Sequence, residues 1–203
     1  MEELLSLRPL TDGELARWYE TELAEAFAPQ ERKPLADIRA LRDRGRYDVL
    51  GLFGGGPLLG YAALWSAPGG RVLLLDYLGV TAARRNGGLG GQLLSLLGGF
   101  CGGRRLVAEA ELPIPGGGED ENALRRRRIG FYERCGFAPV YEMATCGLRW
   151  QALVLGDPPP PGSPELAALM AGHRAVYGSR RADVRIPLPA GERPAPPYWM
   201  EQA

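Results

Sequence analysis

Hydrophobic residues follow two patterns along this chain: short continuous runs, and runs spaced as on one face of a helix. The short runs predict strands over residues 4–10, 47–53, 58–65, 72–80, 104–112, 137–145 and 148–155. Helical spacing begins after the cap-like Thr11 and recurs over residues 35–41, 89–97, the stretch before Gly136 and the stretch after Ser163. This mixture of strands and helices predicts an α/β protein.

Residues 71–97 join a buried strand to an amphipathic helix through a turn rich in glycine. A helix N-terminus carries unpaired N–H groups and the positive end of the helix dipole. Glycines let a ligand approach that backbone closely. The turn therefore predicts a site for a phosphate or pyrophosphate, with Arg84 or Arg85 at its mouth. A glycine-rich turn that binds nothing is the alternative.

Two common phosphate motifs do not fit this turn. The dinucleotide fingerprint G-x-G-x-x-G is not satisfied by residues 87–91. A P-loop requires a lysine, and the only lysine, Lys33, lies far away in the sequence.

Two segments carry a family resemblance. The first is an R-x-x-G-x-G turn preceded by a strand end, formed by Leu78, Gly79, Val80, Arg85, Asn86, Gly87, Gly88, Leu89, Gly90 and Gly91. The second is a helix end followed by a strand, with Phe131, Tyr132, Gly136 and Phe137 in a Tyr-x-x-x-Gly-Phe pattern. In this order, over about residues 3–155, they resemble the acetyl-CoA site of the GNAT (Gcn5-related) N-acetyltransferases.

The resemblance implies a GNAT-like fold and a domain division. We expect a twisted mixed sheet of six to seven strands flanked by about four helices, within an acetyl-CoA-binding domain over residues 1–156. Residues 157–203 would add a proline-rich linker, a short helix, and a tail that packs on the domain or on the partner in a homodimer. On the short helix, His173 is expected to pack rather than react.

The same resemblance implies roles for individual residues. Residues 78–80 and 85–91 would bind acetyl-CoA, and Tyr132 would protonate the departing thiolate. For the general base, Glu109 is favoured over Asp76, and a chain of water molecules with no single base is the other possibility. Relatives often carry an asparagine where this chain has Arg125, so Arg125 would contact the cofactor phosphate or an acidic group of the substrate, or lie on an exposed basic face with Arg128.

The implied reaction is transfer of an acetyl group from acetyl-CoA to a primary amine, by direct attack in a ternary complex. The acceptor is a small-molecule or peptide amine that the sequence does not identify. A non-catalytic domain that senses acyl-CoA is the alternative, and a phosphate-binding domain unrelated to CoA is a third possibility.

Asn122 is expected to cap the helix that carries Tyr132.

Composition narrows the range of partners. The 203 residues carry 24 basic and 24 acidic side chains, a balance that indicates neither nucleic acid nor a membrane surface as partner. Three cysteines and one histidine predict no metal site. The N-terminal residues are too acidic and too short of apolar length for a signal peptide, so we expect a cytoplasmic protein.

Overall fold

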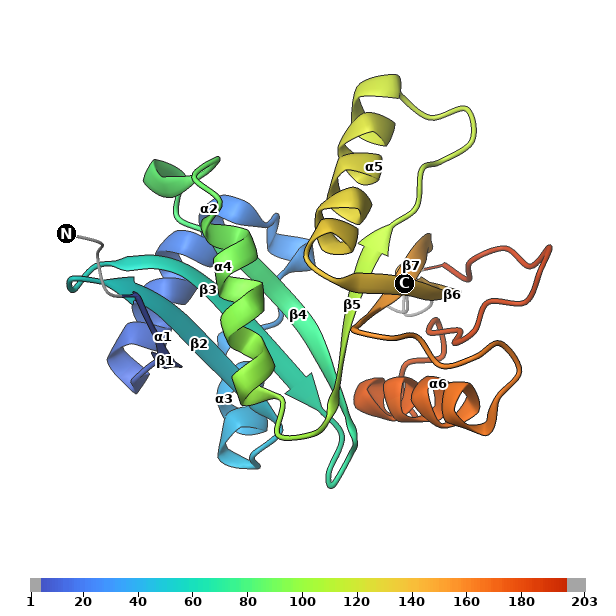
Figure 1. Ribbon diagram of the computed structural model, residues 1–203, viewed down its shortest axis with the longest axis horizontal. Coiled ribbons are helices and arrows are strands. Elements are labelled where there is room, and N and C mark those ends of the chain that lie inside the picture. The colour runs from blue at the N-terminus through green and yellow to red at the C-terminus, as the bar shows by residue number, and fades with distance from the viewer. Residues whose placement is uncertain (1–4, 197–203) are drawn as a thin grey trace. The chain divides into compact units, whose positions relative to one another are not determined.

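The computed structural model describes residues 5–196 and contains one seven-stranded mixed sheet (Figure 1). Its strands are β1 (Leu5–Pro9), β2 (Tyr47–Gly54), β3 (Leu58–Ser66), β4 (Val72–Val80), β5 (Arg105–Glu111), β6 (Phe137–Thr145) and β7 (Leu148–Leu155). The α-helices are α1 (Asp12–Trp18), α2 (Ala24–Ala26), α3 (Leu35–Asp43), α4 (Leu89–Leu97), α5 (Glu119–Arg134) and α6 (Pro164–Tyr177). The strand order is β1-β2-β3-β4-β5-β7-β6, which confirms the mixed sheet predicted from the sequence.

The chain forms two compact units, which are described separately. The first unit contains the chain up to Pro68 together with Leu75–Gly102. The second contains Gly69–Leu74 and the chain from Gly103 onward. The predicted division into residues 1–156 and 157–203 remains a prediction.

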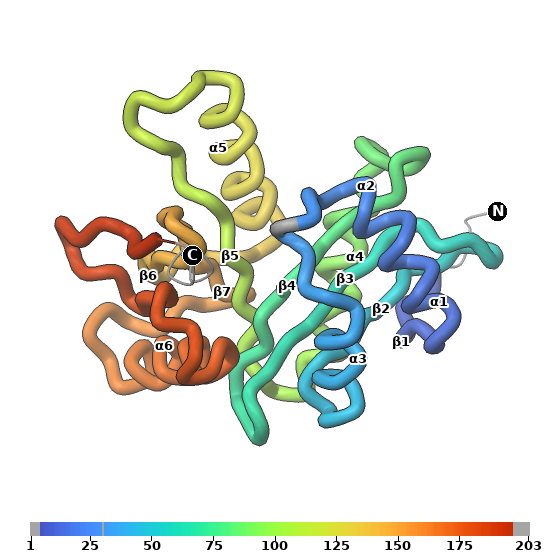
Figure 2. The backbone as a smooth tube through the Cα atoms, turned by 180° about the vertical axis from the view of Figure 1, so that it is seen from behind, coloured from blue at the N-terminus to red at the C-terminus, as the bar shows by residue number. Residues whose placement is uncertain are grey.

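In the first unit, β1, β2 and β3 form an antiparallel meander. Leu7 of β1 pairs with Leu52 of β2, and Val49 of β2 pairs with Ala63 of β3. Helix α4 covers one face of this meander, and α1 and α3 cover the opposite face (Figures 1 and 2). Both faces of β2 and β3 are therefore apolar, which explains their continuous hydrophobic runs.

The first helix begins at the predicted cap. The Thr11 side chain accepts a hydrogen bond from the Glu14 N–H, and the Glu14 carboxylate accepts one from the Thr11 N–H. Arg8 donates two further hydrogen bonds to that carboxylate, at 2.9 and 2.7 Å. Past Trp18 the helix widens into a π-helical stretch, Tyr19–Leu23, before α2. The capping box thus fixes the start of the helical segment.

In the second unit, β7 lies between β5 and β6 and is antiparallel to both. Glu109 of β5 is paired with Ala152 of β7, and Tyr141 of β6 is paired with the same residue from the other side. Helix α5 packs on β5 and β6. This arrangement places side chains of β5 and β6 close enough to be bridged by one helix.

The expectation that Asn122 caps α5 is wrong. The helix begins at Glu119 with Gly118 at the N-cap, because three acidic residues already suit its first turn. The Asn122 side chain instead accepts a hydrogen bond from the Ile114 N–H at 2.8 Å and donates one to the Ile114 carbonyl at 2.9 Å. Asn122 therefore fastens the loop between β5 and α5.

The C-terminal extension returns to the sheet of its own unit. Arg185 and Ala144 exchange two backbone hydrogen bonds, and the Leu188 N–H donates to the Glu142 carbonyl. Val184 and Leu188 are buried. The extension thus lies along β6 as far as Leu188.

Residues 5–196 contain neither a helix that could span a membrane nor a cluster of metal-binding side chains. No helix in residues 5–196 has the length and apolar character needed to cross a membrane. The same residues contain no group of three or more His, Cys, Asp or Glu side chains placed to hold a metal ion.

Candidate functional site

The glycine turn of the first unit opens helix α4 as the sequence predicts. Gly88 is the N-cap of the helix and has a φ of 77°, a left-handed conformation in which side chains are strained. Asn86 also has a positive φ, of 64°. Within the described residues, the N–H groups of Leu89 and Gly90 form no backbone hydrogen bond. Two donors at the positive end of the helix are therefore available to an anion.

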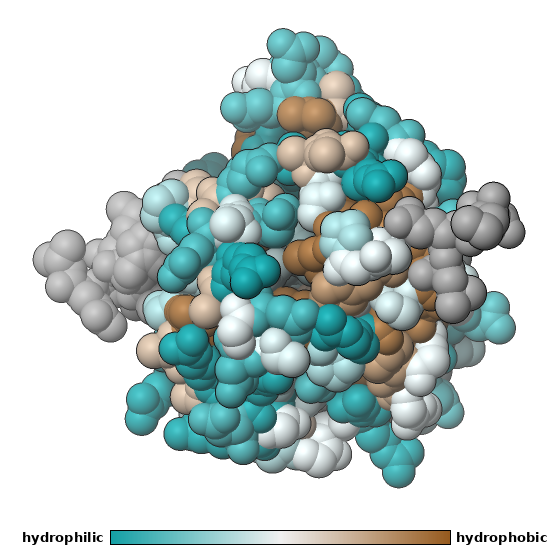
Figure 3. Space-filling model, turned by 90° about the vertical axis from the view of Figure 1, so that its left-hand side faces the viewer, coloured by the Kyte–Doolittle hydropathy of each residue, from teal (hydrophilic) through white to brown (hydrophobic). Residues whose placement is uncertain are grey.

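A cavity of about 770 Å³ lies beside this turn. Its wall includes Leu59, Arg84, Arg85, Gly87, Gln92 and Leu96. Leu96 is 41% exposed, and Figure 3 shows hydrophobic surface between hydrophilic side chains on one face of the molecule. A cavity with both arginines and apolar walls suits a ligand that carries phosphate on an apolar body.

The two arginines of the turn differ in their contacts. Arg85 donates a hydrogen bond to Glu25 at 2.9 Å and another to the Val80 carbonyl at 3.3 Å. Arg84 is exposed and also lines the cavity. Arg85 therefore links the turn to the end of β4 and to α2, while Arg84 forms part of the cavity wall.

The strand end Leu78-Gly79-Val80 is held by close packing within the first unit. A Cβ atom at Gly79 would fall 2.3 Å from Cζ of Tyr61, and one at Gly60 would fall 2.9 Å from the Gly79 carbonyl oxygen. Only glycine fits at either position without a shift of the neighbours. The backbone of β3 and β4 is consequently in close contact where acetyl binding was predicted.

Asp76 lies in a cluster of charged and aromatic side chains. It accepts a short hydrogen bond from the hydroxyl of Tyr47, and its Oδ2 lies 3.3 Å from Nζ of Lys33. That ammonium also lies 4.3 Å from the ring centroid of Trp65. Burial first, and then the Asp76 charge, raise the pKa of Tyr47, so its hydroxyl stays protonated and donates. Asp76 is thus held as an ion-paired carboxylate.

Tyr132 lies in the second unit near the C-terminal end of α5. Its ring is 8% exposed and packs edge-on against Phe137, with centroids 5.4 Å apart. Burial raises the pKa of Tyr132 to about 12; the Arg128 charge opposes this rise, and the Glu109 charge adds to it. The phenol is therefore protonated at neutral pH and carries a proton that it can donate.

Glu109, on β5, lies beside two side chains of α6. The hydroxyl of Tyr177 lies 2.7 Å from both carboxylate oxygens, and Nε2 of His173 lies 2.8 Å from Oε1. The sequence predicts that His173 packs, and it is fully buried, but it also meets the carboxylate. Sequence reasoning missed this cluster, as it missed Lys33 beside Asp76. The one available signal was a histidine on the same helical face as Val176.

Arg125 makes ion pairs within its own unit. Its Nε lies 2.9 Å from Glu111, and its Nη1 lies 3.4 Å from Glu121. Hydrogen bonding to Glu111 is the main cause that raises the pKa of Arg125. The guanidinium joins α5 to β5, and a role toward the cofactor or the substrate would compete with these partners.

Comparisons place this geometry among known folds. No family model matches the chain, and no curated protein matches it. The fold is the α/β fold of acetyltransferases, in which a glycine-rich turn precedes a helix, as it does here before α4.

Solved structures that match over most of the chain include GNAT-family acetyltransferases. One, assigned to that family in Bacteroides thetaiotaomicron, is 24% identical, has a TM-score of 0.64, and covers 86% of this chain and 99% of its own. The ribosomal-protein-S18-alanine N-acetyltransferase of Escherichia coli is 17% identical, with a TM-score of 0.57 and coverage of 79% and 98%. An acetyltransferase of Salmonella typhimurium, solved with its cofactor acetyl-CoA, is 22% identical, with a TM-score of 0.52 and coverage of 75% and 93%. At these identities the likeness establishes the GNAT fold.

Proposed function

We propose that this protein is an N-acetyltransferase that moves an acetyl group from acetyl-CoA to a primary amine by direct attack in a ternary complex. The observation that carries the proposal is the left-handed Gly88 at the start of α4, where the N–H groups of Leu89 and Gly90 form no backbone hydrogen bond with any residue of 5–196 and lie beside a large cavity. The GNAT fold supports it, because a protein of the same fold was solved with acetyl-CoA.

The residues present fit the phosphate end of the cofactor. The backbone of Asn86–Gly91 would hold the pyrophosphate, with added charge from Arg84 or Arg85. The backbone at residues 78–80 would meet the acetyl oxygen. The bound cofactor supplies the acetyl group as a thioester, which is activated toward nucleophilic nitrogen.

Proton transfers would be divided between two residues of the second unit. Glu109 takes one proton from the ammonium of the acceptor, which frees the nitrogen lone pair to attack. The phenol of Tyr132 would supply the proton that the departing thiolate needs, and the proton that the acceptor nitrogen loses on amide formation would restore the phenol through solvent. Glu109 is kept as the proposed base over Asp76, as the resemblance favours; Asp76 is paired with the Lys33 ammonium, whereas the Tyr177 hydroxyl on Glu109 is neutral.

The acceptor is proposed only as a class, a small-molecule or peptide amine. The Escherichia coli protein of this fold acts, by its name, on an alanine of a ribosomal protein. That example is compatible with a peptide N-terminus as acceptor here and does not exclude small amines. Cytoplasmic location and homodimer formation remain predictions.

Calorimetric titration of acetyl-CoA tests the proposed site. The wild-type protein is compared with Gly90→Trp, which places a large ring at the helix N-terminus, and with Gly99→Trp as the matched control. Gly90 is preferred to Gly88 because the positive φ of Gly88 would add strain, and a Cβ at Gly99 would meet open space. We expect binding by the wild type and the control and none by Gly90→Trp. Equal binding by all three would place the cofactor elsewhere, and no binding by any would remove the proposal.

A further inference from the structure

A buried cluster within the second unit joins β5, β6 and α6 through four side chains. The carboxylate of Glu109, whose side chain is 12% exposed, meets the hydroxyl of Tyr177 at 2.7 Å and Nε2 of His173 at 2.8 Å. Nδ1 of His173 lies 2.9 Å from the hydroxyl of Tyr141 on β6. His173 is fully buried, and its Nε2 lies beside the carboxylate without a hydrogen bond to any described residue.

Donor and acceptor chemistry gives the cluster one consistent proton arrangement. A carboxylate only accepts hydrogen bonds, so the Tyr177 hydroxyl donates to Glu109. If the Tyr141 hydroxyl donates to Nδ1, the neutral imidazole carries its proton on Nε2, which lies near the carboxylate but forms no hydrogen bond with it. Tyr177 is therefore the side chain that donates to Glu109, and its hydroxyl fixes the orientation of the carboxylate.

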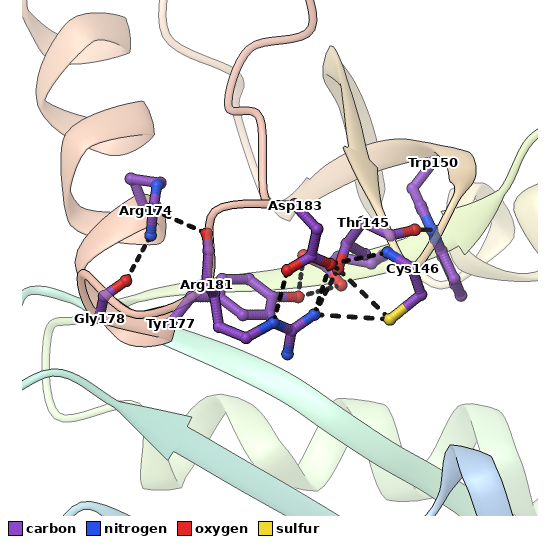
Figure 4. A network of polar contacts seen from close by, with 9 residues as sticks. Thr145, Cys146, Trp150, Arg174, Tyr177, Gly178, Arg181 and Asp183 are labelled. Carbon is purple, nitrogen blue, oxygen red and sulfur yellow. Dashed lines mark hydrogen bonds and ion pairs between the residues drawn. The ribbon is translucent and has the colours of Figure 1, made fainter. Parts of the chain in front are cut away.

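The end of α6 that carries Tyr177 is firmly anchored. Arg174 donates hydrogen bonds to the carbonyls of Gly178 and Arg181, at 2.7 and 3.1 Å. Arg181 in turn pairs with Asp183, and Figure 4 shows this pair beside the ring of Tyr177. The position of the Tyr177 hydroxyl is therefore set by the turn that follows the helix.

The charged and titratable groups around the cluster come from several elements. The Arg181 guanidinium carbon lies 5.4 Å from the centroid of the Tyr177 ring, and Asp183 balances its charge. The Glu109 charge contributes, after burial, to raising the pKa of both Tyr132 and Tyr141. The charge of Glu109 therefore also acts on Tyr132, the proposed acid.

We propose that Tyr177 is a positioning residue that holds Glu109 in one orientation as the general base, so that helix α6 is part of the site that activates the acceptor amine. This inference rests on the proposed acetyl transfer. Tyr177 exchanges no proton in the step: Glu109 takes the ammonium proton while Tyr177 keeps its own. The competing explanation is a purely structural tie between α6 and β5.

The pH dependence of kcat/KM separates these explanations. Tyr177→Phe removes a hydrogen-bond donor from Glu109 and should move the acidic limb of the profile to higher pH. Acetyl-CoA binding should be unchanged in this variant. Glu109→Gln should lower kcat/KM by about 10²-fold or more and abolish the limb.

Asp183→Asn is the matched control, because it loosens the anchor after α6 without touching Glu109. It should lower the melting temperature and leave the acidic limb in place. Tyr177→Phe made in the Glu109→Gln background should add little further loss, since its target is gone.

The outcomes are distinct. An active wild type whose acidic limb does not move in Tyr177→Phe would overturn this inference and leave the proposed function standing. An equal shift in Asp183→Asn would also overturn it, because loosening of the helix would then be sufficient. A wild type that binds acetyl-CoA and acetylates no amine in a broad panel would overturn the proposed function, and the inference with it.

Discussion

Gly79 of β4 and Tyr61 of β3 are packed so closely that a Cβ atom on Gly79 would lie 2.3 Å from the Tyr61 ring. Real Cβ atoms essentially never approach so near, so the glycine is required by its neighbour across the strands. The end of β4 is therefore shaped by an aromatic side chain of the first unit, at the strand end where the acetyl group is proposed to bind.

Gly79→Ala is expected to destabilise the protein by about 1–3 kcal/mol, because the methyl group forces the buried Tyr61 ring to move. Urea unfolding measures the loss. Gly99→Ala, where a Cβ meets open space, serves as the control and should change little. If Tyr61→Leu is combined with Gly79→Ala, the double variant should lose less than the sum of the two single losses. Wild-type stability in Gly79→Ala would contradict the packing argument.

Tyr132→Phe tests whether the protein is an enzyme rather than a sensor of acyl-CoA. Removing the hydroxyl leaves the ring packed on Phe137 but takes away the proton proposed for the thiolate. We expect kcat to fall by about 10²-fold or more with acetyl-CoA affinity unchanged. Release of free CoA thiol and calorimetric titration provide the two readouts. Full activity in the variant would exclude Tyr132 as the acid.

Acid should weaken the tie between Asp183 and Arg181. Burial alone would raise the pKa of Asp183, but hydrogen bonds from Arg181 and from the Cys146 N–H outweigh it and lower the pKa to about 2. A carboxyl group whose pKa is lowered on folding stabilises the protein above its unfolded pKa and loses that contribution as pH falls through the folded value.

The contribution of Asp183 to the free energy of unfolding should be about 1–2 kcal/mol at neutral pH and should disappear between about pH 5 and pH 2. Urea unfolding of the wild type and Asp183→Asn over this range checks it. The unfolding free energies of the two proteins should converge as pH falls. A constant difference down to pH 2 would mean that loss of the Asp183 charge is not the cause of the lower stability.

Asn122→Ala should loosen the loop that joins β5 to α5. The amide makes both hydrogen bonds to the Ile114 backbone from a buried position, so its loss should cost about 1–3 kcal/mol. Hydrogen exchange at the Ile114 amide should accelerate more than exchange in β5. Asn122→Asp keeps the acceptor and loses the donor, so its exchange rate at Ile114 should lie between those of the wild type and Asn122→Ala. Unchanged exchange at Ile114 in both variants would show that the loop is held elsewhere.

The strands and helices were largely predictable because their signals are local. Apolar runs marked β4 and α4, Thr11 marked the start of α1, and the glycines predicted the turn whose Gly88 is left-handed. Asn122 was misjudged because a short amide can satisfy a loop as readily as a helix end, and spacing does not distinguish the two.

The partners of the candidate site residues were not predictable, since they come from distant parts of the sequence. Arg85 meets Glu25, which lies 60 residues earlier, and Glu109 meets Tyr177, which lies 68 residues later. A helical face shows that a side chain will be buried; it does not show which strand it will meet. The sequence thus predicted Glu109 as a candidate base but did not predict Tyr177 and His173 as its neighbours.

The separation between Glu109 and Tyr177 also has a consequence for how the protein is made. Domains generally fold as the chain emerges during synthesis, with N-terminal parts first. The carboxylate of Glu109 cannot meet His173 until 64 further residues have been added, or Tyr177 until 68 have been added. The second unit can therefore be completed only after helix α6 has left the ribosome.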